Sequence, residues 1–298
     1  MSQPLAGQRI VIGHLFAGLL NLYGDQGNIA TLVRRAEWRG LTVEVREIGA
    51  TQADRLAGVD ILFIGGGQDA QQVIVAQGLA ALGGALIEAV GAGAALLAVC
   101  GGYQALGHVY RSELVGELVG PGLFDLWTEA PPEAQRNVGG IVVELAEDSP
   151  IALAGRASAL AAGLPGAERR IVGFENHSGR TYLGPATRSI GRVVLGYGNN
   201  ERDGTEGMIA APGDGGLAGP RIGTYLHGPL LPRNPHVADY LLGYALSRHS
   251  DLALSPLADG TEWRAQAAFA DSWEAERTTN RGSRFGPIGE RIGSLVGF

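Results

Sequence analysis

Cys100 is the only cysteine in the 298-residue chain, and the residues around it are typical of a nucleophile held at a turn. Residues 94–99 are small or apolar and predict a buried strand, two glycines follow Cys100, and residues 103–110 have a helical pattern. A strand that turns sharply into a helix exposes one side chain at the sheet edge and points the helix N-terminus at it, which favours a thiolate. The alternative is a small buried hydrophobe, as free cysteines often are.

A cysteine nucleophile needs a base, and the chain offers six histidines. His227 follows the strand-like residues 221–226 and precedes Gly228-Pro229, so it lies at a strand end on a turn that cannot continue as a helix. On spacing alone His177 and His14 remain alternatives. His108 lies on the helix after Cys100 and points away from its N-terminus, and His236 and His249 bracket a candidate helix, so we expect these two to be surface or capping residues.

The elements that position these residues alternate between strand and helix in the first 110 residues. Such alternation predicts right-handed crossovers and a mostly parallel sheet, with functional groups beyond the carboxyl ends of its strands. Cys100 and the run Gly65-Gly66-Gly67 both fall at such ends. The strand candidates are residues 9–13, 41–48, 60–64 and 94–100, and the helix candidates are 28–39 and 78–90.

The second half of the chain has a different pattern, with short strand candidates separated by Gly, Pro and Asn. It predicts an antiparallel extension of the same sheet. A helix is predicted over residues 236–248 and another over 261–277, and residues 278–298 have the composition of a tail. The strand candidates are 138–145, 170–174, 192–197, 208–211 and 222–226.

Composition excludes several classes of protein. Apolar content of 45% and charged content of 18% are those of a soluble globular chain. The net charge of −7 argues against broad nucleic-acid binding, which needs a basic face. One cysteine forms no internal disulfide, the N-terminus has no apolar segment typical of a signal peptide, and no uninterrupted run of 18 apolar residues predicts a membrane span. We expect a cytoplasmic protein.

Several motifs together resemble one enzyme class. Residues 99–104, Val-Cys-Gly-Gly-Tyr-Gln, are similar to the nucleophile motif of class I glutamine amidotransferases, and Gly65–Gly67 is similar to their oxyanion loop. Residues 225–228, Tyr-Leu-His-Gly, resemble the histidine motif of the cobyric-acid-synthase-like branch. Residues 20–28, 135–138 and 173–181 extend the resemblance to the glutaminase subunit of lipid II isoglutaminyl synthase, the GatD type. The resemblance spans about residues 9–249.

The resemblance implies an α/β fold with three layers. A central, mostly parallel sheet would carry helices on both faces and an antiparallel extension. The class I glutamine amidotransferase domain would occupy residues 1–250. Residues 251–298 would form a partly helical C-terminal extension, for which flexibility is one alternative.

The resemblance also assigns roles in the site. Cys100 would attack the amide of L-glutamine to form a thioester, and His227 would transfer the proton. The backbone amide of Gly101, with that of Gly66 or Gly67, would hold the oxyanion.

Two further residues would bind the substrate. Gln104 lies one helical turn after the nucleophile, and Arg136 would grip the α-carboxylate of glutamine. The alternative for Arg136 is a surface charge. Glu175, Asn176 and His177 either line the site or stabilise a polar turn.

One position departs from the wider class. Many class I enzymes place an orienting glutamate two residues after the histidine, where this chain has Pro229. The carboxylate must come from elsewhere in the chain or from a partner, or be absent. The resemblance points to the partner and therefore to weak glutaminase activity of the isolated chain.

The resemblance implies that this partner is a Mur-ligase-like synthetase subunit in a heterodimer. ATP and Mg²⁺ would bind there, because this chain has no phosphate-loop motif. We expect no cofactor and no metal in this chain, and the membrane-bound lipid II as the final acceptor. The alternatives are the glutaminase of a cobyric-acid-type amidotransferase, a non-catalytic interaction module, and a cysteine hydrolase or peptidase.

Overall fold

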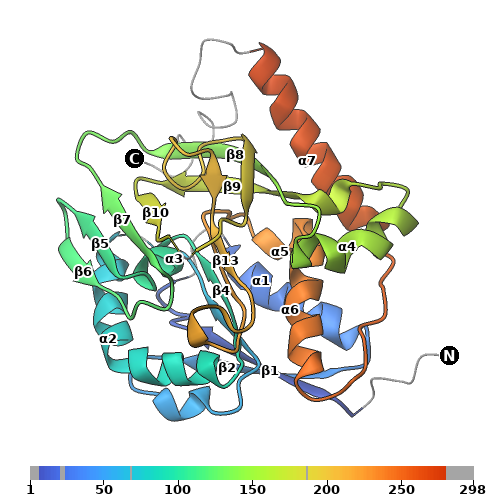
Figure 1. The fold of residues 1–298 in the computed structure, drawn as a ribbon, viewed down its shortest axis with the longest axis horizontal. Helices are drawn as coiled ribbons and strands as arrows, with labels where there is room; N and C mark the ends of the chain where they lie inside the picture. The colour runs from blue at the N-terminus through green and yellow to red at the C-terminus, as the bar shows by residue number, and fades with distance from the viewer. Residues whose placement is uncertain (1–6, 21–23, 68, 186, 280–298) are drawn as a thin grey trace.

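A six-stranded sheet forms the centre of the computed structural model, which describes residues 7–20, 24–67, 69–185 and 187–279 (Figure 1). The strand order is β13-β14-β4-β3-β1-β2, and every neighbouring pair is parallel except β13 with β14. This confirms the predicted mostly parallel sheet. The strands are β1 (Arg9–Leu15), β2 (Thr42–Ile48), β3 (Ile61–Ile64), β4 (Ala95–Val99), β13 (Met208–Ala210) and β14 (Arg221–Thr224).

Helices cover both faces of this sheet, α2 on one side and α1 with α6 on the other (Figure 1). The middle strands β3 and β4 are therefore fully buried and consist of apolar residues. The helices are α1 (Gln26–Glu37), α2 (Asp69–Gly91), α3 (Gly101–Ala105), α4 (Pro150–Ala161), α5 (Leu230–Arg233), α6 (Pro235–Ser247) and α7 (Gly260–Thr279).

Helix α2 is the one helix of the described residues that is long and apolar enough to cross a membrane. Residues Val75, Leu79, Leu82 and Leu86 of this helix are buried in the core at a spacing of three to four residues. That spacing is the apolar stripe of a helix packed on a sheet.

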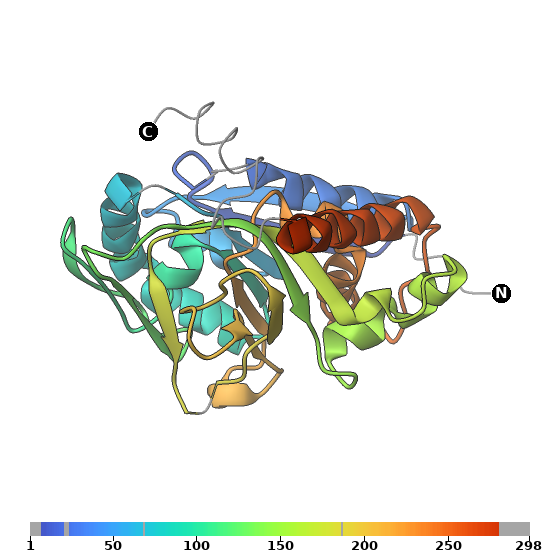
Figure 2. The ribbon, with the colours of Figure 1, turned by 90° about the horizontal axis from the view of Figure 1, so that it is seen from above.

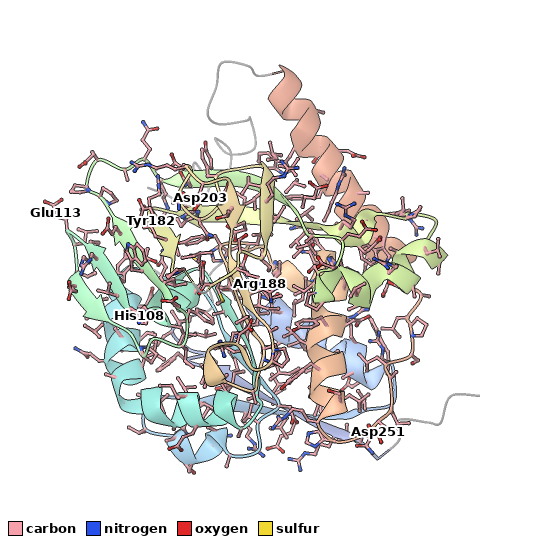
Figure 3. All side chains as sticks on the ribbon, in the orientation of Figure 1. His108, Glu113, Tyr182, Arg188, Asp203 and Asp251 are labelled. Atoms are coloured by element: carbon pink, nitrogen blue, oxygen red, sulfur yellow. The ribbon has the colours of Figure 1, made fainter. Side chains whose placement is uncertain are left out.

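Two smaller four-stranded sheets flank the central one. The predicted continuous extension is wrong in this detail, because three of its five strands form a separate antiparallel sheet of order β12-β11-β8-β9. The predicted helix over 103–110 is also wrong after Ala105, where the chain enters a third sheet of order β10-β7-β5-β6. Figure 3 shows Glu113 at the tip of the β5–β6 hairpin.

These strands have the following bounds: β5 (Val109–Ser112), β6 (Gly116–Val119), β7 (Leu126–Ala130), β8 (Asn137–Glu144), β9 (Arg170–His177), β10 (Arg180–Leu183), β11 (Gly191–Leu195) and β12 (Thr205–Glu206).

The helix predicted over 261–277 is present as α7 and lies across β8 and β9 (Figure 2). Trp263 is fully buried, and its indole Nε1 donates to Ser158 Oγ at 2.9 Å. Just before α7, Asp259 forms an ion pair with the buried Arg35 of α1, which also pairs with Asp239 of α6, both at 2.7 Å. These contacts hold the start of α7 against the domain, and the predicted tail lies outside the described residues from residue 280 onward.

Replacing Trp263 with Ala should lower the free energy of unfolding by about 3–5 kcal/mol, because it leaves a large cavity beneath α7. Urea denaturation measures this loss. Trp38→Ala is the matched control, since Trp38 is 62% exposed. A loss no larger than that of the control would show that α7 does not stabilise the domain.

Candidate active site

Cys100 and the residues leading to His227 lie at the same edge of the central sheet. Strands β4 and β14 are parallel neighbours, with Thr224 opposite Val99, so both chains leave the sheet side by side. The amide of Cys100 donates to Thr224 O at 2.8 Å and fixes this register at the nucleophile. The sheet topology therefore brings Cys100 close to His227, although the two residues are 127 positions apart in the sequence.

Cys100 adopts a strained backbone conformation, with φ 49° and ψ −107°. Such a conformation persists only where surrounding contacts hold it. The next turn supplies one of them, since Gly102 N donates to Gly65 O at 3.1 Å. A Cβ on Gly102 would lie 2.8 Å from that oxygen, so the close approach of the two loops requires glycine. The predicted strand–nucleophile–helix turn is present, although helix α3 has only five residues.

Backbone hydrogen bonds hold His227 in place, in addition to its position after strand β14. Its N–H donates to Phe174 O at 2.7 Å, and Phe174 N donates back to His227 O at 3.2 Å. Phe174 belongs to β9, so the second sheet fixes the base against the first. The His227 side chain is fully buried.

Asp25 is the residue that sequence reasoning missed. Its carboxylate is fully buried, with Oδ1 3.6 Å from His227 Nδ1 and Oδ2 accepting the amide of Gly66 at 2.6 Å. The available signal was its place: Asp25 follows the first strand and immediately precedes α1, so it lies beyond the carboxyl ends of the parallel strands.

The glycine loop lies directly against the two predicted catalytic residues. A Cβ on Gly66 would approach His227 Cε1 to 2.6 Å and Cys100 Cβ to 3.2 Å. The amide of Gly66 points to Asp25, which corrects the expectation that it faces an oxyanion. The amides of Gly67 and Gly101 remain the predicted oxyanion donors, and Gly101 is the first residue of α3, where backbone amides lack intrahelical acceptors.

The charges in this cluster favour a protonated base. Burial by itself lowers the pKa of His227, but the charge of Cys100 and the contact with Asp25 outweigh it and raise that pKa to about 10. An imidazolium beside the sulfur stabilises a thiolate. The arrangement can therefore supply a nucleophile and, from the same base, a proton for a leaving group.

His14, the alternative base, does not take this role. It is buried at the end of β1 and packs on Phe63, with ring centroids 5.4 Å apart. Burial lowers its pKa, which keeps it neutral. Among the other histidines, His236 is buried against Trp263 rather than exposed or capping, and His249 Nε2 contacts Asp60 at 2.6 Å.

The two predicted substrate-binding residues lie in different surroundings. Gln104 is buried, and its side-chain amide donates to the Tyr225 hydroxyl at 3.0 Å. Arg136 is exposed, hydrogen-bonds the side chain of Asn176, and lines a cavity of about 440 Å³. Arg180 and Glu201 also line this cavity, so it presents both signs of charge.

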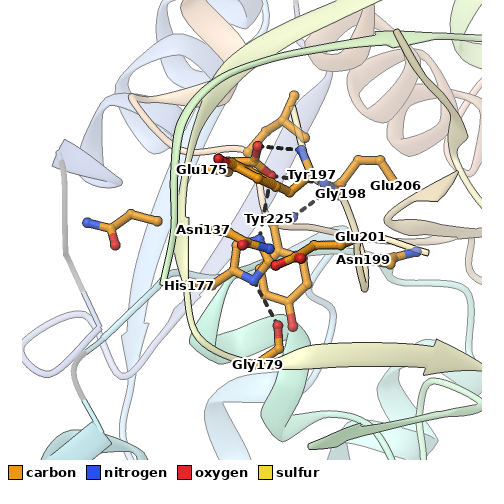
Figure 4. Close-up of polar contacts among 12 residues, drawn as sticks. Asn137, Glu175, His177, Gly179, Tyr197, Gly198, Asn199, Glu201, Glu206 and Tyr225 are labelled. Atoms are coloured by element: carbon orange, nitrogen blue, oxygen red, sulfur yellow. Dashed lines mark hydrogen bonds and ion pairs between the residues drawn. The ribbon is translucent and has the colours of Figure 1, made fainter. Parts of the chain in front are cut away.

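Glu175 and His177 form a buried pair next to Tyr225 (Figure 4). The His177 ring stacks on Tyr225 with centroids 3.6 Å apart, its Nδ1 contacts Gly179 O at 2.9 Å, and its Nε2 lies 3.5 Å from Glu175. Burial lowers the pKa of His177 to about 3 and raises that of Glu175 to about 8, so the pair is neutral at pH 7. These residues support Tyr225, two positions before His227.

Replacing Glu175 with Gln should give a chain that becomes more stable relative to the parent as pH rises. The folded-state pKa of Glu175 lies above its ordinary value, so its contribution is fully present below about pH 4.5 and is lost as pH approaches 8. The amide that replaces the carboxyl group does not ionise. Thermal melts between pH 5 and 8 measure the difference, with Glu117→Gln on the exposed hairpin as control. A difference in melting temperature that does not change with pH would contradict an ionisation cost at Glu175.

Comparisons with known proteins agree on one enzyme class. A family model of the CobB/CobQ-like glutamine amidotransferase domain matches residues 11–235. The lipid II isoglutaminyl synthase (glutamine-hydrolyzing) subunit GatD of Staphylococcus aureus is 38% identical over 239 residues, 80% of this chain and 85% of that protein. The subunit of the same name from Streptococcus pneumoniae is 33% identical over 237 residues, 80% of each chain.

Comparison with a solved structure shows a similar fold. The glutaminase domain of Trypanosoma brucei CTPS, with bound acivicin, has a TM-score of 0.52. The similarity covers 83% of this chain and 96% of that chain, at 12% sequence identity. At that identity the likeness concerns the fold alone.

Proposed function

Because this chain belongs to the CobB/CobQ-like glutamine amidotransferase family, we propose that Cys100 and His227 hydrolyse L-glutamine through a thioester. One observation supports this more than any other. The strained nucleophile turn, the base and the glycine loop meet at the end of β4 and β14, with Gly66 packed against both side chains.

The proposed reaction proceeds in two halves. The Cys100 thiolate attacks the side-chain amide carbon of glutamine and forms a C–S bond, while the amides of Gly67 and Gly101 stabilise the oxyanion. The C–N bond then breaks, and the imidazolium of His227 gives its proton to the departing nitrogen, which leaves as ammonia. Water attacks the thioester with His227 as base, the C–S bond breaks, and glutamate leaves with the thiolate restored.

Arg136 would recognise the amino-acid end of the substrate. Its guanidinium lies over the cavity beside Asn176 and close enough to His177 to influence that ring electrostatically. A planar guanidinium binds a carboxylate through two parallel hydrogen bonds. Gln104 would contribute to the site indirectly, through the hydrogen bond that its side-chain amide donates to the Tyr225 hydroxyl.

The names of the relatives extend the proposal to a pathway. We infer that this chain is the glutaminase subunit of a lipid II isoglutaminyl synthase. It would pass ammonia to a Mur-ligase-like partner, which uses ATP and Mg²⁺ to amidate the α-carboxyl of D-glutamate in lipid II and so gives D-isoglutamine. This reaction belongs to the cytoplasmic stage of peptidoglycan synthesis. The family description also favours, as a second candidate, the glutaminase of a cobyric-acid-type synthase.

Replacing Cys100 with Ala should abolish glutamate release from glutamine, because the thioester can no longer form. Glutamate formation is measured by NMR, and circular dichroism checks that the fold is kept. Ala98→Gly on the preceding strand is a control without a reactive group. Glutamate release by the Cys100→Ala chain at the parent rate would disprove the thioester mechanism.

Lipid II amidation should require both chains. With glutamine as nitrogen donor, a mixture of the synthetase partner, ATP and lipid II should give D-isoglutamine only when this chain is present with Cys100 intact. With free ammonia, the Cys100→Ala chain should support amidation, since only the glutaminase step is lost. Mass spectrometry of lipid II measures the product. Amidation of a corrinoid acid in place of lipid II would favour the second candidate.

A further inference from the structure

The cavity of about 440 Å³ that Arg136 lines also contains a carboxylate on an unusual backbone. Glu201 lines this cavity with φ 65°, in the left-handed region that residues other than glycine rarely adopt. Such a conformation persists only where its surroundings hold it, and it is frequent at positions that bind ligands. The contacts that hold Glu201 therefore indicate what its carboxylate can do.

A buried asparagine holds the loop that carries Glu201. Asn200 is 3% exposed, and its Oδ1 accepts the backbone amides of Arg202 at 3.0 Å and Asp203 at 3.1 Å. Its Nδ2 donates to Thr181 O at 3.0 Å, which ties the loop to β10. The backbone is thus fixed on both sides of Glu201.

Arg180 orients the Glu201 side chain. The Arg180 guanidinium is buried and anchored, since it donates to Ser178 O and to Gln135 O, each at 2.8 Å. It forms an ion pair with Glu201 Oε1. The Glu201 side chain is 38% exposed, and among the described residues its Oε2 makes no hydrogen bond. One carboxylate oxygen is therefore fixed, and the other is available to a cationic group of a ligand.

Asn137 contributes an unused hydrogen-bond donor to the same cavity. It is 2% exposed and lies opposite His177 in the β8–β9 pairing (Figure 4). Its Oδ1 accepts from Arg180 at 3.2 Å, and because a guanidinium can only donate, the amide nitrogen must face away from it. Within the described residues this Nδ2 makes no hydrogen bond. A buried donor without a partner fits an acceptor atom of a ligand.

The end of β9 lies between this cavity and the nucleophile turn. On the cavity side, Arg136 hydrogen-bonds the side chain of Asn176. On the other side, a Cβ on Gly179 would collide with Nε2 of Gln104, which lies one helical turn after Cys100. The cavity is therefore separated from the nucleophile turn by one short segment of chain.

We propose that Glu201 is a specificity-determining residue, whose carboxylate binds the α-ammonium group of L-glutamine while Arg136 and Asn137 Nδ2 bind the α-carboxylate. The inference rests on the proposed glutaminase function. Opposite charges at two places in one cavity match the zwitterionic end of an amino acid, whereas an amide that lacks the amino group can occupy only one of them. With this end held, the side-chain amide of glutamine is directed to Cys100.

The test compares L-glutamine with glutaramate, the same molecule without its α-amino group. The full chain is assayed with its synthetase partner for ammonia release. In the parent chain, kcat/KM for glutamine should exceed that for glutaramate at least about 100-fold, because a site that hydrogen-bonds a group rejects the analogue that lacks it. Glu201→Gln should lower this ratio at least about tenfold. The loss should appear as a higher KM for glutamine with kcat nearly unchanged, since the α-ammonium lies away from the bond that breaks.

Glu201→Gly is a second variant that the fold should accept, because glycine readily adopts the left-handed conformation of this position. It should lose the discrimination in the same way. Glu144→Gln is the matched control. Glu144 is 39% exposed and pairs with Arg192 at 2.5 Å, but it lies at the opposite end of β8 from Asn137. This control should keep the ratio of the parent chain.

Three results would contradict these expectations in distinguishable ways. If Glu201→Gln lowers kcat/KM for glutamine and for glutaramate by the same factor, Glu201 only supports the fold and the proposal is overturned. Equal use of the two substrates by the parent chain would overturn it as well. If the parent chain with its partner releases no ammonia from glutamine, the proposed function fails instead.

Discussion

The parallel pairing of β4 with β14 is the constraint on which the site depends. It places the turn after Val99 beside the loop after Thr224, and the amide of Cys100 bonds directly across this pair. Because neighbouring parallel strands end at one edge, a nucleophile and a base from distant parts of the chain meet there without any long side chain. The buried apolar residues of β3 and β4 hold this register, so the core and the chemistry share one framework.

The residues that could be predicted from sequence are those with a strong local pattern. Cys100 stands between an apolar strand and two glycines, and His227 between a strand and Gly-Pro, so each local sequence indicates a strand end. The α/β order of the first hundred residues follows from the same alternation. Five short strands after Ala105 were missed: β5, β6, β7, β10 and β12. Strands β8, β9 and β11 were predicted, but their pairing into a separate sheet is decided by tertiary contacts rather than by local periodicity.

Asp25 was missed for a different reason. Its place between the first strand and α1 is a weak signal, and its closeness to His227 accompanies a contact across the fold between Gly27 and Pro229. The hydrogen bond from the Gly66 amide to Asp25 depends on the same contact, and it could not be predicted from the sequence either. A sequence pattern can identify residues that lie at the same edge of a sheet. The distances between the loops that carry these residues decide which of them are in contact.

The ion pairs of Arg35 connect α1 to residues that lie beyond the family match. The family match stops at residue 235, yet a guanidinium in the core of α1 is neutralised by Asp239 and Asp259, both beyond that point. A buried charge stripped of a partner costs about 3–5 kcal/mol, a large share of the stability of an ordinary domain. A shortened chain that ends at residue 235, where the family match ends, would therefore leave the buried guanidinium of Arg35 without either carboxylate partner.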